Sequence, residues 1–111
     1  MSNARDIADA GHQLVAWVNF DGTNAFSPNP STSAIRASFN VSSIFSYGTG
    51  QYGINFTPDM PDTNYVIIAM TGDNRIIGSG LNGTSTVSQA RVSTQAGGAF
   101  SNEDVFLAIF R

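Results

Sequence analysis

The sequence predicts an all-β fold, a single antiparallel β-sandwich of about seven or eight short strands. Its 111 residues match the length of one domain. Runs of β-branched and aromatic residues recur along the chain, and Gly, Asn, Asp and Pro interrupt them about every eight to twelve residues. Between residues 12 and 111 the apolar positions show no periodicity of helix length.

The first eleven residues differ from the rest of the chain. Ser2 or Asn3 could cap a short helix, and Gly11 is a typical stop signal. A segment this short does not hold a helix by itself in water. We therefore expect 1–11 to be a helical or extended stem or linker, followed by the sandwich at 12–111.

The strands are predicted from alternation and from the turns between them. Residues 14–20 are rich in β-branched and aromatic types and end at the turn dipeptide Asp21-Gly22. Residues 34–41 alternate in polarity, which predicts one strand with two different faces. Asn82-Gly83 predicts a hairpin. The expected strands are 14–20, 34–41, 43–47, 52–56, 65–70, 75–78, 87–92 and 105–110, with a long exposed loop at 23–33.

Two of these runs, 65–70 and 105–110, are apolar without interruption. Such a run is typical of a strand that is covered on both faces, so we expect 65–70 to be central. With 41% hydrophobic residues, one modest core cannot bury every apolar side chain. We expect the single chain to expose an apolar patch built from Val105, Leu107, Ile109 or their neighbours.

Charge and composition exclude several function classes. The chain has five Arg, no Lys and eight acidic residues, with a net charge of −3, which disfavours nucleic acid and anionic membranes as partners. No run of about 18 apolar residues occurs, so no membrane insertion is expected, and the N-terminus lacks the pattern of a signal peptide. The absence of Cys excludes disulfides and thiol chemistry. The lone His12 is expected to be solvated, although three copies could bind a metal on a threefold axis.

No motif for catalysis or for a cofactor is found, so we expect neither an enzyme nor a bound cofactor. Paired carboxylates could hydrolyse glycosides, but Asp21, Asp59, Asp62 and Asp73 all lie in predicted turns or loops. Aspartate in a turn usually caps backbone N–H groups, and we favour that interpretation.

Three side chains on the predicted strands have competing interpretations. Trp17 could stack on a sugar, but its apolar neighbours favour a place in the core. Arg36 lies between apolar neighbours and needs a partner, for which Asp21 or Asp62 are the candidates. Arg91 lies on a polar face and could contact an acidic sugar, although a solvated side chain is the ordinary alternative.

A series of motifs carries a resemblance to a known family. They are WVNFDG at 17–22, IRAS at 35–38, NVSSI at 40–44, GTGQY at 48–52, INFT at 54–57, MPD at 60–62 and NY at 64–65, with VFLAIFR at 105–111 as a final strand. In order and spacing this series resembles the C-terminal domain of tail-fibre and related tail proteins of tailed bacteriophages. The match covers 14–70 well and the last strand loosely, and 24–32 looks like an insertion.

The resemblance implies a virion protein at the distal end of a tail fibre, a homotrimer attached to the rest of the fibre and in contact with the host cell surface. The expected ligand is a surface glycan, bound without catalysis. Two alternatives are a purely structural trimerisation cap and a small trimeric lectin unrelated to phages. A polysaccharide depolymerase is disfavoured, because it needs a larger domain with a carboxylate-lined groove.

A receptor site is expected in loops, since loops are free to vary. The loops are 71–74, 81–86 and 94–102, with 23–33 as a rim. The candidate ligand-binding residues are Phe26, Asn74, Asn82, Thr84, Gln89, Arg91 and Phe100, and the candidate structural residues are Trp17, Arg36, Asp62 and Phe110.

Overall fold

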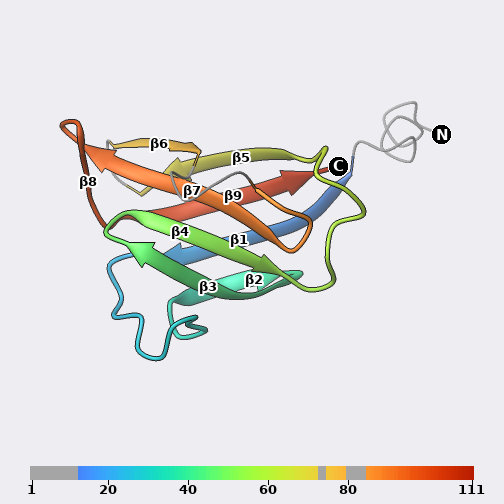
Figure 1. Cartoon of the computed structure of the whole chain (residues 1–111), viewed down its shortest axis with the longest axis horizontal. Helices are drawn as coiled ribbons and strands as arrows, with labels where there is room; N and C mark the ends of the chain where they lie inside the picture. The colour runs from blue at the N-terminus through green and yellow to red at the C-terminus, as the bar shows by residue number, and fades with distance from the viewer. Residues whose placement is uncertain (1–12, 73–74, 80–84) are drawn as a thin grey trace.

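The computed structural model describes residues 13–72, 75–79 and 85–111, and over these ranges the chain forms nine strands and no helix (Figure 1). The stem expected at 1–11 and the hairpin expected at Asn82-Gly83 lie outside the described residues. The strands are β1 (Leu14–Asp21), β2 (Ile35–Phe39), β3 (Val41–Gly48), β4 (Gln51–Phe56), β5 (Val66–Thr71), β6 (Ile76–Ser79), β7 (Gln89–Ala96), β8 (Ala99–Phe100) and β9 (Asp104–Phe110).

The strands form two antiparallel sheets that pack face to face, which confirms the predicted β-sandwich. The four-stranded sheet has the order β2-β1-β9-β5. The five-stranded sheet has the order β3-β4-β7-β6, and the short β8 pairs with β7 beyond the turn at Gly97 and Gly98. Both glycines have positive φ, as the tight turn requires.

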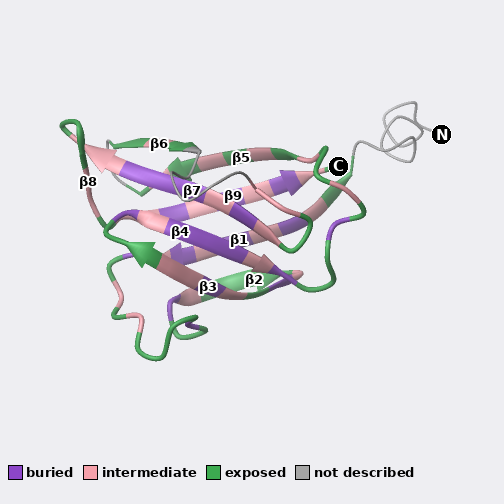
Figure 2. Ribbon diagram, in the orientation of Figure 1, coloured by how far each residue is buried: buried purple, intermediate pink, exposed green. Residues whose placement is uncertain are grey.

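The core lies between the sheets and follows the alternation of the strands (Figure 2). Alternate residues of the two central strands of the four-stranded sheet are buried, and so are their counterparts in the five-stranded sheet. The core residues contributed by β1, β9, β4 and β7 are Ala16, Val18, Phe20, Val105, Leu107, Ile109, Tyr52, Ile54, Phe56, Ala90 and Val92. Val105, Leu107 and Ile109 therefore do not form an exposed patch, and only their neighbours on β9 can.

The single strand predicted at 34–41 is wrong, because the chain changes sheets at Asn40. This residue adopts the left-handed conformation, with φ of 58°, and its side-chain amide donates to the Val15 carbonyl at 2.9 Å. Asparagine tolerates this conformation better than most residues with a Cβ. As a result β2 ends in one sheet and β3 begins in the other.

The prediction that 65–70 is a central strand covered on both faces is also wrong. β5 is the edge strand of the four-stranded sheet and pairs only with β9 among the described strands. Ile67 and Ala69 pack against the core, while Val66, Ile68 and Met70 point outward. The apolar run thus has one buried side and one exposed side.

The Tyr52 side chain joins the two sheets at one end of the core. Its ring packs edge-on against Phe20 at 5.2 Å between ring centroids. Its hydroxyl lies 3.0 Å from the Gly22 carbonyl and 3.2 Å from Asn102 Oδ1, and the Glu103 N–H donates to it at 3.3 Å. Burial raises the pKa of this phenol. The segments that follow β1 and precede β9 are therefore both tied to β4.

Replacing Tyr52 with Phe should lower the free energy of unfolding by about 1–2 kcal/mol, because the buried Gly22 carbonyl and the partly buried Glu103 N–H lose their partner. Urea denaturation at a fixed protein concentration measures this. Tyr47→Phe removes a surface hydroxyl and should cost less than about 0.5 kcal/mol. Equal losses in the two variants would contradict the bridging role of Tyr52.

Candidate functional site: two opposite surfaces of the sandwich

The outer surface of the four-stranded sheet is apolar across all four strands. The strand register places Phe39, Trp17, Ala108 and Ile68 in one row. Phe106 and Met70 lie opposite each other in the next row. We call this surface the apolar face, and it consists of Leu14, Trp17, Phe39, Val66, Ile68, Met70, Phe106, Ala108 and Phe110.

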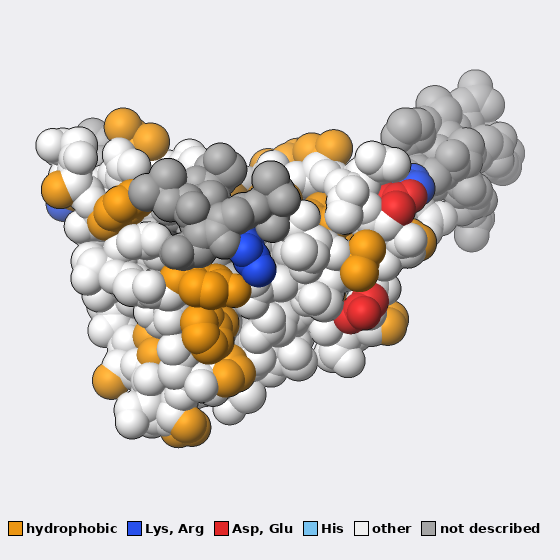
Figure 3. Space-filling view, in the orientation of Figure 1, with side chains coloured by type: hydrophobic (Ala, Val, Ile, Leu, Met, Phe, Trp, Pro, Cys, Tyr) orange, Lys and Arg blue, Asp and Glu red, His pale blue; other side chains and the backbone are white. Residues whose placement is uncertain are grey.

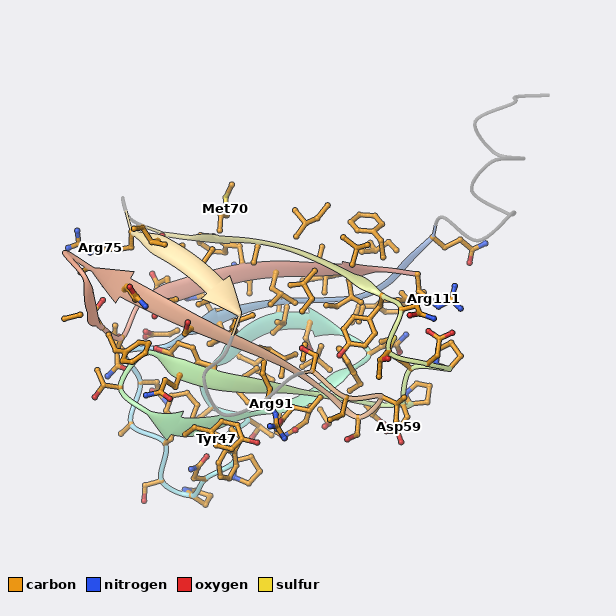
Figure 4. The ribbon with its side chains drawn as sticks, turned by 45° about the horizontal axis from the view of Figure 1, so that its top comes forward. Tyr47, Asp59, Met70, Arg75, Arg91 and Arg111 are labelled. Atoms are coloured by element: carbon orange, nitrogen blue, oxygen red, sulfur yellow. The ribbon has the colours of Figure 1, made fainter. Side chains whose placement is uncertain are left out.

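The apolar face is exposed in the single chain. Val66, Ile68 and Met70 are 58%, 59% and 63% exposed, and Figure 4 shows Met70 pointing away from the ribbon. Of the eight large hydrophobic side chains exposed among the described residues, five belong to this face. A hollow of about 320 Å³ lies over its middle, with Trp17 and Phe106 in its lining. Contiguous apolar surface of this kind marks an interaction site.

Two of the structural residues expected from the sequence lie on the apolar face. Trp17, expected in the core, points to the opposite side of β1 from Ala16 and Val18 and is only partly buried. Phe110 lies opposite Val66 at the end of β9. The alternation of β1 decides the place of Trp17, since Ala16 and Val18 already occupy the inner side.

Arg36 lies at one end of the apolar face within a small charged corner. Its guanidinium donates to Asn19 Oδ1 and to Asp104 Oδ1, both at 3.0 Å, and lies 3.9 Å from Asp21. Asp21 is thus a partner, as expected, whereas Asp62 is not: it pairs with Arg111, whose Nε lies 2.8 Å from Asp62 Oδ1. The Arg36 guanidinium is therefore paired within the chain, with two carboxylates beside one cation.

The opposite surface, on the five-stranded sheet, is polar and aromatic. Two rows cross β3, β4 and β7 there, Ser43–Asn55–Gln89 and Phe45–Gly53–Arg91, and Tyr47 lies beside them. We call these seven residues the Tyr47 platform. Figure 4 shows Tyr47 and Arg91 close together, and in Figure 3 a band of hydrophobic side chains crosses this side of the molecule next to a cationic group.

One side chain, Gln89, organises the platform. Its Oε1 accepts from the Tyr47 hydroxyl at 2.7 Å and from Arg91 Nε at 2.8 Å. Its Nε2 donates to Asn55 Oδ1 at 2.8 Å, and Asn55 Nδ2 donates to Ser43 Oγ at 3.0 Å. The Arg91 guanidinium lies 5.3 Å from the centroid of the Tyr47 ring, a cation–π distance. Three strands are joined by this network.

Glycine is needed at the centre of the platform. A Cβ at Gly53 would overlap the amide of Gln89, which lies across this position. The Gln89 side chain can therefore lie flat on the sheet only because residue 53 has no side chain. Phe45 packs beside the network, with its ring centroid 4.6 Å from that of Tyr47.

Of the four ligand-binding candidates among the described residues, the structure brings Gln89 and Arg91 together and places the other two elsewhere. Phe26 packs toward Tyr52, with 6.1 Å between ring centroids, and contacts the core. Phe100 lies on β8, opposite Gln95. Asn74, Asn82 and Thr84 lie outside the described residues. The sequence analysis missed the other five members of the platform, which are Ser43, Phe45, Tyr47, Gly53 and Asn55. The alternation of Ser43, Phe45 and Tyr47 along one strand was the available signal.

Two of the four aspartates expected in turns cap backbone groups, while Asp73 lies outside the described residues. Asp21 Oδ1 accepts from the Thr23 N–H and Asp62 Oδ1 from the Asn64 N–H, both at 2.9 Å. Over the described ranges, no three His, Cys, Asp or Glu side chains gather where they could hold a metal ion, and His12 is not among the described residues. In the same part of the chain, no helix is long and apolar enough to cross a membrane.

Comparisons of the chain with family models, with curated proteins and with solved structures gave no match.

Replacing Gly53 with Ala should displace the Gln89 amide and break its contacts with Tyr47 and Arg91. Because a flexible side chain can move aside, the free energy of unfolding should fall by less than about 1 kcal/mol. The side-chain NH₂ signals of Gln89 and Asn55 in NMR spectra should shift strongly. Gly78→Ala is the matched control, since open space surrounds that position. Unchanged amide signals in Gly53→Ala would contradict the role of this glycine.

Acid should destabilise the fold through Asp21 and Asp62. The Thr23 hydroxyl holds the pKa of Asp21 below its ordinary value of 3.8, and hydrogen bonding to Arg111 lowers the pKa of Asp62. A lowered pKa in the folded state stabilises the fold above the unfolded value, and this contribution is lost as the pH falls. The urea midpoint should therefore decrease from about pH 5 downward. Asp21→Asn should make this decrease with pH smaller. A variant whose urea midpoint depends on pH as the parent's does would contradict the role of Asp21.

Proposed function

We propose that this chain is the tip domain of a tailed-bacteriophage tail fibre. In this proposal it is a homotrimeric structural protein of the virion, attached to the rest of the fibre, that binds a glycan on the host cell surface without catalysis. Two lines support it. The ordered motifs from Trp17 to Tyr65 resemble the distal domain of tail-fibre proteins. The apolar face is the single structural observation that carries the proposal, because it calls for a protein partner.

The composition of the apolar face favours copies of the same chain as that partner. The face is uncharged along its middle rows, and the Arg36 cation at its end is paired with carboxylates of the same chain. A partner surface that covers it must therefore be apolar as well, and the apolar face itself has this property. Burying a side chain such as Ile68 or Met70 contributes about 1.5–3 kcal/mol, and each copy supplies several.

The proposed trimer places three apolar faces around a threefold axis. Each chain then contacts both others, and the four-stranded sheets line the axis. Trp17, Phe106 and Phe110 would lie inside, and the five-stranded sheets would face the surroundings. This arrangement would explain why β5 and β9 are apolar on both sides.

Replacing Ile68 with Asp should dissociate the trimer, because the carboxylate would be buried without a partner among apolar side chains. Light scattering should give three times 11.7 kDa for the parent chain and one chain mass for the variant. Ile76→Asp is the matched control, since Ile76 is 66% exposed but lies on β6 of the other sheet. A monomeric parent chain would overturn the trimer, and a dimer would keep the interface but contradict the threefold symmetry.

Binding to intact bacteria tests the receptor role. Fluorescently labelled protein should adsorb to host cells, and enzymatic removal of surface polysaccharide should abolish adsorption. A trimer that binds no cells would favour the alternative role of a purely structural trimerisation cap. A trimer that binds sugars but no bacterial surface would favour a small lectin unrelated to phages.

A further inference from the structure

We infer that the Tyr47 platform is the glycan-binding site and that it takes one pyranose ring of a bacterial surface polysaccharide. This inference rests on the proposed function for the source of the glycan. It does not rest on the trimer, because every residue of the platform comes from one chain. It moves the site from the loops favoured by the sequence to the outer face of a sheet.

An exposed aromatic ring is the first element of the site. Tyr47 is 36% exposed and is flanked by Phe45 and by the Arg91 guanidinium. The C–H face of a pyranose packs on such a ring, whereas its hydroxyls need polar partners around the rim. Both kinds of group are present within the platform.

Unused hydrogen-bonding capacity is the second element. A side-chain amide carries two N–H donors, and Gln89 and Asn55 each use one of them within the network. Within the described residues, the second N–H of each donates to no protein atom. The Ser43 hydroxyl accepts from Asn55 and still has a proton to donate, and the Tyr47 oxygen donates to Gln89 and still has lone pairs. Sugar hydroxyls can satisfy both donors and acceptors.

Preorganisation is the third element. The Gln89 amide is fixed by contacts to Tyr47, Arg91 and Asn55, which lie on three adjacent strands. The Asn29 side chain exchanges two hydrogen bonds of 2.9 Å with the backbone of Ser46, so the 23–33 loop is attached next to Tyr47. A site that is already ordered loses little conformational entropy when it binds a ligand.

The place of the platform agrees with the proposed assembly. It lies on the five-stranded sheet, on the opposite side of the sandwich from the apolar face. Three copies that bury their apolar faces at the axis would present three platforms outward. A single weak sugar contact, of about millimolar strength, then gains about 10²–10⁴ in avidity through three sites.

The test measures binding of the full chain to arrayed lipopolysaccharide O-chains and capsular polysaccharides, which distinguishes the two sources. The parent chain should bind at least one pyranose polymer. Tyr47→Ala should weaken this binding at least tenfold. Gly53→Ala should also weaken it at least tenfold, because it displaces the Gln89 amide although every platform side chain is still present. Phe100→Ala is the control, since this aromatic residue lies on β8 outside the platform, and it should bind as the parent does.

The outcomes separate this inference from the proposed function. Retained binding in both Tyr47→Ala and Gly53→Ala would overturn the platform, and so would a parent trimer that adsorbs to cells but binds no arrayed polysaccharide. A monomeric parent chain that binds sugar through Tyr47 would keep the platform and overturn the trimer. Light scattering on each variant shows whether a loss of binding follows from lost assembly, and Gly53→Ala remains decisive should Tyr47→Ala fail to fold.

Discussion

The rest of the molecule depends on one constraint: β9 and its neighbouring strands carry apolar side chains on both of their sides. Val105, Leu107 and Ile109 fill the core from one side of β9, and Phe106, Ala108 and Phe110 project from the other. The five-stranded sheet covers only the first side. Among the described residues nothing covers the outer side of the four-stranded sheet, so its apolar surface is exposed in the single chain.

The two outer surfaces therefore differ in chemistry although both are built from alternating strands. On the four-stranded sheet, large aliphatic and aromatic side chains meet across β5, β9 and β1, and the Arg36 cluster of charges lies at one end of this surface. On the five-stranded sheet, amides and hydroxyls surround Tyr47 in a connected network. The first surface suits association through exclusion of water, and the second suits directional recognition of a polar ligand.

Sequence reasoning succeeded where one strand or one turn carried the information. The sandwich follows from alternation and turn spacing. The need of a mid-strand arginine for a carboxylate correctly predicted Asp21 beside Arg36, although the nearer partner, Asp104, was not predicted. Sequence reasoning failed where it had to decide which of the two sheets, or which side of a sheet, a residue belongs to. Trp17 is a large apolar side chain with apolar neighbours, as core residues are, yet the alternation of side chains along β1 places it on the outer side. Asn40 interrupts an alternating run that gave no other sign of a change of sheet.

The sequence by itself determined the fold class, most of the strands and the excess of apolar residues, because these depend on neighbours along the chain. It also indicated Gln89 and Arg91, but as separate candidates and not as members of one cluster. Only the tertiary structure decided that β5 is an edge strand and that Tyr47, Asn55 and Gly53 meet Gln89. Strand order and register bring residues tens of positions apart into contact, and local sequence patterns do not encode that order.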